Sequence, residues 1–155
     1  MTATPWSTTI CAATAVRRAD RALSRAYDEA LRPAGLATTQ FSLLSIISRA
    51  PHPLTLGDLA AAQVMDRTTL SHNLAPLVRD GLVRLSPGND RRTRTVALTP
   101  AGEDALAAAR PLWRAAQDRI EQVTGDARLQ RLLDDLADLV ERVRDMDTPA
   151  KGSIQ

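Results

Sequence analysis

The amino-acid sequence predicts a mostly helical fold that carries one small β-hairpin. Of its 155 residues, 44% are hydrophobic and 25% are charged, which is ordinary for a folded globular protein, while only 3% are aromatic. Alanine is abundant in both terminal thirds of the chain, where apolar residues recur at steps of three and four. Only in the middle do two short segments alternate between apolar and polar residues around a turn sequence. These observations predict long helices at both ends and a hairpin between them.

The first predicted helix is amphipathic. Its apolar face includes Val16, Ala19 and Leu23, with arginines between these positions. Pro33 and Gly35 are typical of a helix end, so we expect the helix to stop there.

A second helix is expected after this stop, with Thr38 or Thr39 as its N-cap. Phe41 and Ile47 belong to its apolar face, and Pro51 marks its end.

Two shorter helices follow, separated by a tight turn. Thr55 and Asp58 have the spacing of a capping box at the start of one, and Asp66 is placed to cap the other. Gly81 ends the second of these helices. Pro76 lies inside it and lacks a backbone donor, so we expect either a bend near Pro76 or displacement of the helical hydrogen bond four residues upstream.

The hairpin is predicted from alternation at residues 83–85 and 96–99, with the turn sequence Pro87-Gly88-Asn89-Asp90 between them. Its tip is rich in arginine: four of the six arginines between Leu54 and Thr99 lie from Arg84 to Arg94. Residues 126–147 are acidic instead, with seven carboxylates against four arginines. The net charge of +2 is therefore unevenly distributed along the chain, with a basic middle and an acidic C-terminal part.

Two further helices are expected after Thr99-Pro100, where Thr99 is the cap and Pro100 takes the first helical position, and a break between the two helices is expected at Gly125-Asp126. Both have apolar residues at alternating steps of three and four, which is typical of helix pairing, either within the chain or between two copies. Each such line of apolar residues is a seam that can pack against another helix, and two successive seams favour a homodimer. The predicted interface residues are Val16, Leu23, Leu129, Leu132, Leu136, Leu139 and Val143.

The order of short helix, turn, second helix and hairpin is that of a winged helix-turn-helix. A helix fits the major groove of B-DNA, and polar residues near its N-terminus reach base edges there. The predicted recognition-helix contacts are Arg67, Thr68, Thr69, Ser71, His72 and Asn73. Arg67 suits either a guanine or a phosphate. The predicted wing contacts, suited to the narrow minor groove, are Asp90, Arg91, Arg92 and Arg94.

Several of these segments resemble those of MarR-family regulators. They are the run Asp66-Arg67-Thr68-Thr69-Leu70, the sequence Gly81-Leu82-Val83, the wing from Asn89 to Arg92, and residues 96–102. The likeness covers roughly residues 10 to 146. It implies that Asp90 buttresses Arg92, and that terminal helices of two subunits intertwine so that the dimer binds a pseudopalindromic operator.

The resemblance also implies release from DNA by a small aromatic or lipophilic ligand, for which Phe41 and Trp113 are the candidate pocket residues. We therefore expect a cytoplasmic repressor with dimerisation helices at 1–35 and 100–147, a DNA-binding module at 36–99 and a flexible tail at 148–155. No cofactor, metal site or membrane span is expected, and no catalytic motif suggests an enzyme.

Two alternatives remain at this stage. Cys11 is the only cysteine, near the start of the first helix, and an activated thiol there would make the protein an oxidant-sensing repressor. Tyr27 is the only tyrosine, and on a shared helix it would lie roughly 24 Å from Cys11, so their contact would need the partner subunit. The other alternative is a winged-helix module that binds proteins and no DNA.

Overall fold

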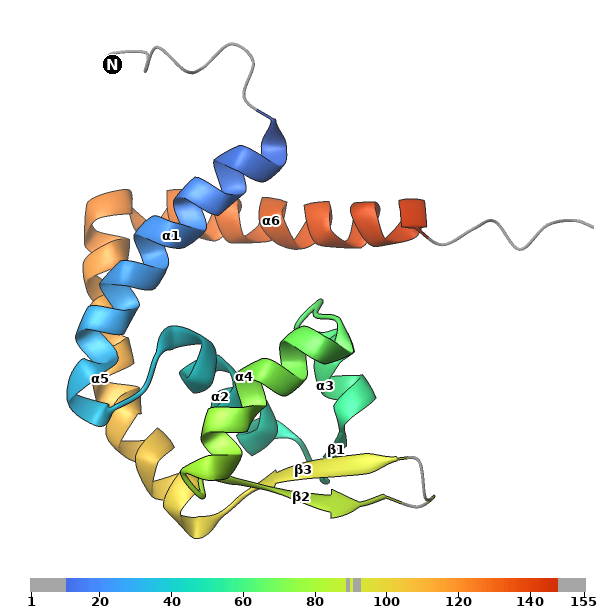
Figure 1. Cartoon of the computed structure of the whole chain (residues 1–155). Coiled ribbons are helices and arrows are strands. Elements are labelled where there is room, and N and C mark those ends of the chain that lie inside the picture. The colour runs from blue at the N-terminus through green and yellow to red at the C-terminus, as the bar shows by residue number, and fades with distance from the viewer. Residues whose placement is uncertain (1–10, 89, 91–92, 148–155) are drawn as a thin grey trace, which may run out of the picture. The chain divides into compact units, whose positions relative to one another are not determined.

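The computed structural model describes residues 11–88, 90 and 93–147 of the chain. Helices dominate, with a small antiparallel sheet (Figure 1). In chain order the elements are α1 (Ala12–Leu31), the 3-10 helix η1 (Arg32–Ala34), α2 (Thr38–Arg49), β1 (Leu54–Thr55), α3 (Leu56–Ala62), α4 (Arg67–Arg79), β2 (Val83–Pro87), β3 (Arg94–Leu98), α5 (Pro100–Thr124) and α6 (Asp126–Asp147). The predicted fold class, a mostly helical winged helix-turn-helix, is confirmed.

The chain forms two compact units, residues 1–116 and 117–155, with the division inside α5. The first unit holds the winged helix-turn-helix. Its core combines leucines from five helices with Val83 and Val96 from the sheet. The fully buried side chains are Leu31, Leu43, Leu44, Leu59, Leu70, Leu77, Leu106 and Val96. This single core fixes α4 and the hairpin on one scaffold.

The sheet has three strands in the order β1-β3-β2, all antiparallel neighbours. Pairing of Val83 with Leu98 and of Pro87 with Arg94 confirms the predicted hairpin. The sequence did not indicate β1, which has only two residues. Leu54 pairs with Val96, so the strand leading into α3 is tied to the wing.

Three predicted helix caps are confirmed. Thr55 Oγ1 accepts a hydrogen bond from the N–H of Asp58 at 3.0 Å, and Asp66 Oδ1 accepts one from the N–H of Thr69 at 2.8 Å. Thr99 Oγ1 accepts from the N–H of Gly102 at 3.1 Å. Each cap satisfies a backbone donor that the first turn of a helix leaves free. These side chains therefore set where α3, α4 and α5 begin.

The predicted cap of α2 is wrong. Ala37 occupies the N-cap position, and its N–H donates to Gln40 Oε1 at 2.8 Å. Thr38 is already inside the helix, and its hydroxyl and N–H both donate to Asp28 Oδ1 of α1 at 2.6 Å. A carboxylate ten positions upstream thus binds the threonine expected to act as the cap.

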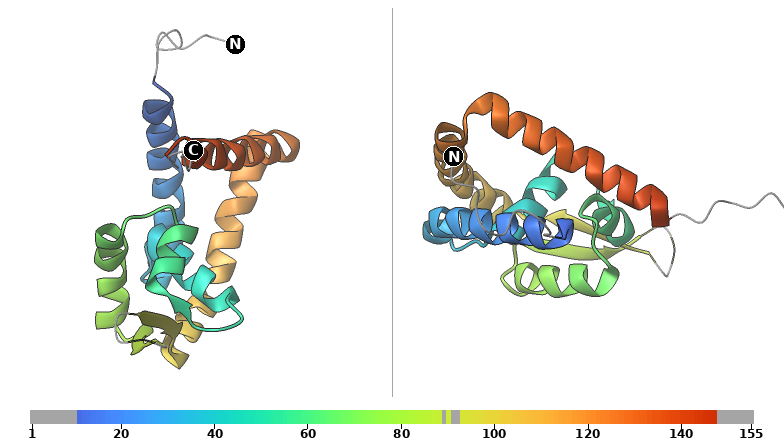
Figure 2. Two further views of the ribbon diagram at one scale, coloured as in Figure 1. Left: turned by 90° about the vertical axis from the view of Figure 1, so that its right-hand side faces the viewer. Right: turned by 90° about the horizontal axis from the view of Figure 1, so that it is seen from above.

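Pro76 does not interrupt α4, which continues to Arg79. The turn before α4 contains Val64 at a φ of 52°, a left-handed conformation rare for a β-branched residue. The first turns of α4 and the ends of β2 and β3 next to the turn lie on the same side of the winged helix-turn-helix (Figures 1 and 2).

The second unit consists of residues 117–124 of α5 and all of α6, joined at Gly125, whose φ is 85°. The predicted break at Gly125-Asp126 is confirmed. Many of the large apolar side chains of α6 are exposed, namely Leu132, Leu133, Leu139, Val140, Val143 and Met146. In the part of the chain that the structure describes, no helix has both the length and the apolar character of a membrane span.

Candidate nucleic-acid interface and ligand pocket

Helix α4 buries one side and exposes the other. Leu70, Leu74 and Leu77 belong to the core. The predicted recognition residues Arg67, Thr68, Thr69, Ser71 and His72 are all exposed. A polar, solvent-facing stripe therefore runs along the first two turns of α4.

Two of these predicted contacts have partners within the chain. The hydroxyl of Thr69 donates to Asp66 Oδ2 at 2.9 Å, in addition to the backbone cap. These bonds from Thr69 lower the pKa of the Asp66 carboxyl below its ordinary value, so the cap is anionic at neutral pH. Asn73 is half-buried, and its Nδ2 donates to Met65 Sδ at 3.6 Å, so it supports the turn before α4.

In the wing, Arg94 is exposed at the start of β3, opposite Pro87. Asp90 Oδ1 accepts hydrogen bonds from the N–H and the hydroxyl of Thr93, both at 2.7 Å. Arg91 and Arg92 lie outside the described residues, and so does the predicted brace between Asp90 and Arg92. Thr93, which the sequence analysis did not single out, is held by Asp90.

A groove of about 340 Å³ lies between the start of α3, the start of α4 and the wing. We call it the α4–wing groove. Arg67 and Arg94, predicted separately as helix and wing contacts, both line it. The remaining lining residues are Thr55, Leu56, Gly57, Leu70, Ser71 and Thr93.

The two predicted pocket residues come together. The ring of Phe41 in α2 stacks on Trp113 in α5 with centroids 5.7 Å apart, and Tyr27 of α1 stacks on the same indole at 6.5 Å. These rings line a cavity of about 620 Å³, here called the aromatic pocket. Sequence reasoning missed Tyr27.

Three arginines also line the aromatic pocket, and the sequence analysis missed them too: Arg49, Arg110 and Arg114. The guanidinium carbon of Arg114 lies 5.8 Å from the centroid of the Trp113 ring. An Arg110 amino group donates to Ser48 Oγ at 3.3 Å. The spacing of these residues could have indicated two of the arginines. Trp113 and Arg114 lie three and four positions after Arg110, so all three share one face of a helix. The pocket therefore combines aromatic rings with positive charge.

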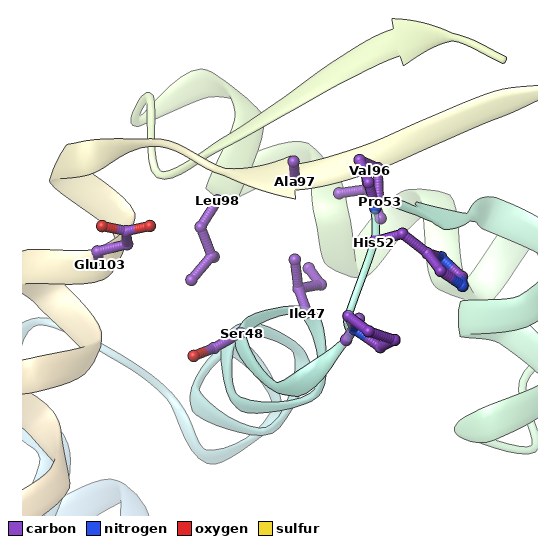
Figure 3. Close-up of a pocket in the computed structure, with 10 residues that line it drawn as sticks. Ile47, Ser48, His52, Pro53, Val96, Ala97, Leu98 and Glu103 are labelled. Carbon is purple, nitrogen blue, oxygen red and sulfur yellow. The ribbon is translucent and has the colours of Figure 1, made fainter.

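A smaller hollow of about 330 Å³ lies where the end of α2, the loop Pro51-His52-Pro53, β3 and the start of α5 meet (Figure 3). Its lining includes Ser48, His52 and Glu103. No three metal-ligating side chains come together within the described residues.

The residues predicted to form the dimer interface differ in how far the single chain exposes them to solvent. Val16 and Leu23 of α1 are 41% and 39% exposed, and in α6 Leu132, Leu139 and Val143 are exposed to a similar degree. Leu136 is half-buried and Leu129 is buried. α1 and α6 thus each carry apolar surface that the single chain leaves open to water.

Cys11 is exposed at the N-cap position of α1. The backbone N–H groups of Thr14 and Ala13 at the start of α1, with a smaller effect of Arg17, lower the pKa of its thiol. Tyr27, the tyrosine considered above as a contact for Cys11, stacks on Trp113.

Comparison with known proteins identifies the family. The model of the MarR family matches residues 34–93. The transcriptional regulator MosR of M. tuberculosis, solved in complex with DNA, is 44% identical, with 87% of this chain and 99% of that chain covered and a TM-score of 0.77. No protein with a curated description matches the sequence.

Two further solved structures are similar over most of their length. The repressor CouR of Rhodococcus jostii RHA1, solved on a 23-mer DNA duplex, is 25% identical, with 84% of this chain and 92% of that chain covered and a TM-score of 0.75. AbsC of Streptomyces coelicolor, a MarR-family transcriptional regulator, is 26% identical, with 92% and 99% covered and a TM-score of 0.74. The chain therefore belongs to the MarR family of transcriptional regulators.

Proposed function

We propose that the protein is a homodimeric repressor that binds a pseudopalindromic double-stranded DNA operator and is released by a small aromatic ligand. The observation that carries the proposal is the stripe of exposed polar residues on α4, next to an exposed wing arginine, on a helix whose other side is anchored in the core. Short hydrogen-bonding side chains at the start of such a helix suit base edges in the major groove. The DNA complexes of MosR and CouR support this reading.

Residues 36–99 form the DNA-binding module in this proposal, while residues 1–35 and 100–147 dimerise. Exposed leucines and valines on α1 and α6 support it, because an isolated chain gains nothing from leaving them in water. A two-fold dimer presents two recognition helices about one turn of DNA apart. The operator of such a dimer has inverted half-sites.

We place the effector in the aromatic pocket. Stacked rings attract a planar aromatic group, and Arg49, Arg110 and Arg114 add donors for an acidic group on the same molecule. CouR has been solved with p-coumaroyl-CoA, an aromatic acyl thioester with anionic groups. A ligand wedged between α1, α2 and α5 acts on the elements that hold α4 in place.

Electrophoretic retardation tests this function. The wild type is expected to retard a duplex selected from a random-sequence library, with affinity falling steeply as salt rises. Aromatic acids and their coenzyme A thioesters are then added to the complex, and at least one is expected to release it. Arg114→Gln is expected to keep operator affinity and weaken release. Absence of retardation at low salt would instead support a winged-helix module that binds only proteins.

A second candidate, the oxidant-sensing repressor, is favoured by one observation. The Cys11 thiol is exposed and its pKa is lowered, so a larger share is thiolate at neutral pH than for an ordinary cysteine. Thiolates react with peroxides to form sulfenic acid. In this version organic hydroperoxide releases the wild type from the operator but leaves Cys11→Ser bound.

The lowered pKa itself is open to measurement. Because Cys11 is the only cysteine, the rate of alkylation by iodoacetamide reports on its thiolate alone. As pH rises, the rate in the folded protein is expected to reach half its maximum at a lower pH than in the urea-unfolded protein, where the start of α1 no longer lowers the pKa of the thiol. Coincident midpoints would show that the helix start does not activate the thiol.

A further inference from the structure

The α4–wing groove brings two positive charges to one place. Arg67 is the first residue of α4 and Arg94 the first of β3, and both line the groove. None of its lining residues is acidic. Positive charge is therefore concentrated between α4 and the wing, the two elements proposed to contact DNA.

The neighbouring carboxylates already have partners. Asp58 accepts a hydrogen bond from Thr55 Oγ1 at 2.7 Å, Asp66 caps Thr69, and Asp90 holds Thr93. Among the residues that the structure describes, no hydrogen bond or ion pair engages the side chain of Arg67 or of Arg94. Both guanidinium groups thus remain available to an anion from outside.

Gly57 contributes no side chain to the lining of the groove. A Cβ added at Gly57 would meet only Thr55 Oγ1, at an ordinary 3.7 Å. Ser71 lies one turn after Arg67 on the same side of α4 and also lines the groove, so it adds a hydroxyl. Positive charge, a hydroxyl and a lining glycine without a side chain suit a phosphate, which arginine binds through two donors at once.

We propose that the α4–wing groove holds one phosphate of the DNA backbone between Arg67 and Arg94, so that Arg67 positions α4 on the duplex and does not read a base. The proposal rests on the proposed DNA-binding function and narrows it. A phosphate contact carries no sequence information, whereas a guanine contact does. Reading of bases is then left to the exposed residues of α4 outside the groove, such as Thr68 and His72.

The test compares two duplexes of equal length and composition. One is the operator selected with the wild type from a random-sequence library, and the other is its scrambled version. Fluorescence anisotropy gives the affinity of each from 50 to 300 mM KCl for the wild type, Arg67→Gln, Arg67→Lys, Arg94→Gln and the double variant Arg67→Gln/Arg94→Gln. Arg79→Gln is the matched control, because it removes a charge at the other end of α4 that is already paired with Asp80.

The expected result is the same fractional loss on both duplexes. Arg67→Gln and Arg94→Gln each lower affinity about tenfold at 100 mM salt, with the ratio of operator to scrambled affinity unchanged and a shallower salt dependence. Because the two arginines share a phosphate, the double variant loses less than the product of the single losses. Arg67→Lys keeps most of the salt dependence, and Arg79→Gln binds like the wild type.

A separate variant adds a negative charge to the lining of the groove. Gly57→Glu is expected to fold normally, as judged by circular dichroism, because its Cβ has room. Its carboxylate repels a phosphate in the groove, so affinity falls on both duplexes at least as far as in Arg67→Gln.

Three outcomes would overturn the groove assignment while leaving DNA binding intact. Arg67→Gln could weaken only the operator, which would make Arg67 a base reader. The double variant could show the full product of the single losses, which would place the arginines on separate contacts. Arg79→Gln could lose as much as Arg67→Gln, which would make the effect one of general charge. If the wild type binds neither duplex, the proposed function itself fails.

Discussion

Leu139→Asp is expected to make the protein monomeric and to lower its operator affinity about 100-fold or more, because a monomer holds one half-site where a dimer holds two. Leu139 is 40% exposed in the single chain, amid other exposed apolar residues of α6. A carboxylate placed in a dimer seam must be desolvated without a partner, at a cost of several kcal/mol. Light scattering on a sizing column measures the mass, and anisotropy measures the affinity.

The control for this variant is Gln130→Glu. Gln130 lies nine residues before Leu139, or about two and a half turns of α-helix, so the two residues lie on opposite sides of α6. The side-chain amide of Gln130 donates a hydrogen bond to Asp134. The same negative charge is added there on the other side of α6, so the dimer should survive. A Leu139→Asp protein that remains dimeric would exclude this part of α6 from the interface. Circular dichroism shows whether α6 still folds.

Gly102→Ala is expected to lower the free energy of unfolding by about 1 to 3 kcal/mol, the usual cost of forcing a methyl group into a packed site. A Cβ on Gly102 would overlap the carbonyl oxygen of Leu82, so α5 or the residue leading into β2 has to move. That oxygen also accepts a hydrogen bond from the N–H of Thr99 at 3.1 Å. Urea denaturation at one fixed protein concentration gives the difference.

Gly57→Ala is the matched control, since both glycines lie in the first turn of a helix. The added methyl group has ordinary contacts at Gly57, so the free energy of unfolding should stay the same or rise by about 0.5 to 1 kcal/mol. Equal stability of the two alanine variants would mean that the approach of Gly102 to Leu82 relaxes without cost.

Local chemistry explains what the sequence could predict of the fold. Thr55, Asp66 and Thr99 cap helices through contacts with residues three positions on, so their roles are visible in a short window of sequence. The failures depend on distant partners. Thr38 binds Asp28 of another helix, and Leu54 joins a sheet through Val96, more than forty residues later.

The same distinction holds for the candidate sites. Phe41 and Trp113 were predicted to share a pocket from the family resemblance, and the structure stacks their rings. The role of Tyr27 follows only from the packing of α1 near α5. The meeting of Arg67 with Arg94 likewise depends on how the hairpin folds back beside α4, which no periodicity in either segment encodes.

The stacking around Trp113 gives the protein a built-in optical reporter. The chain has two tryptophans, and this one lies against rings contributed by α1 and α2. An aromatic molecule entering the pocket must touch the indole or displace one of its neighbours, and either event changes the emission of the indole. Candidate effectors can therefore be ranked by intrinsic fluorescence on the unlabelled protein, before any operator is known.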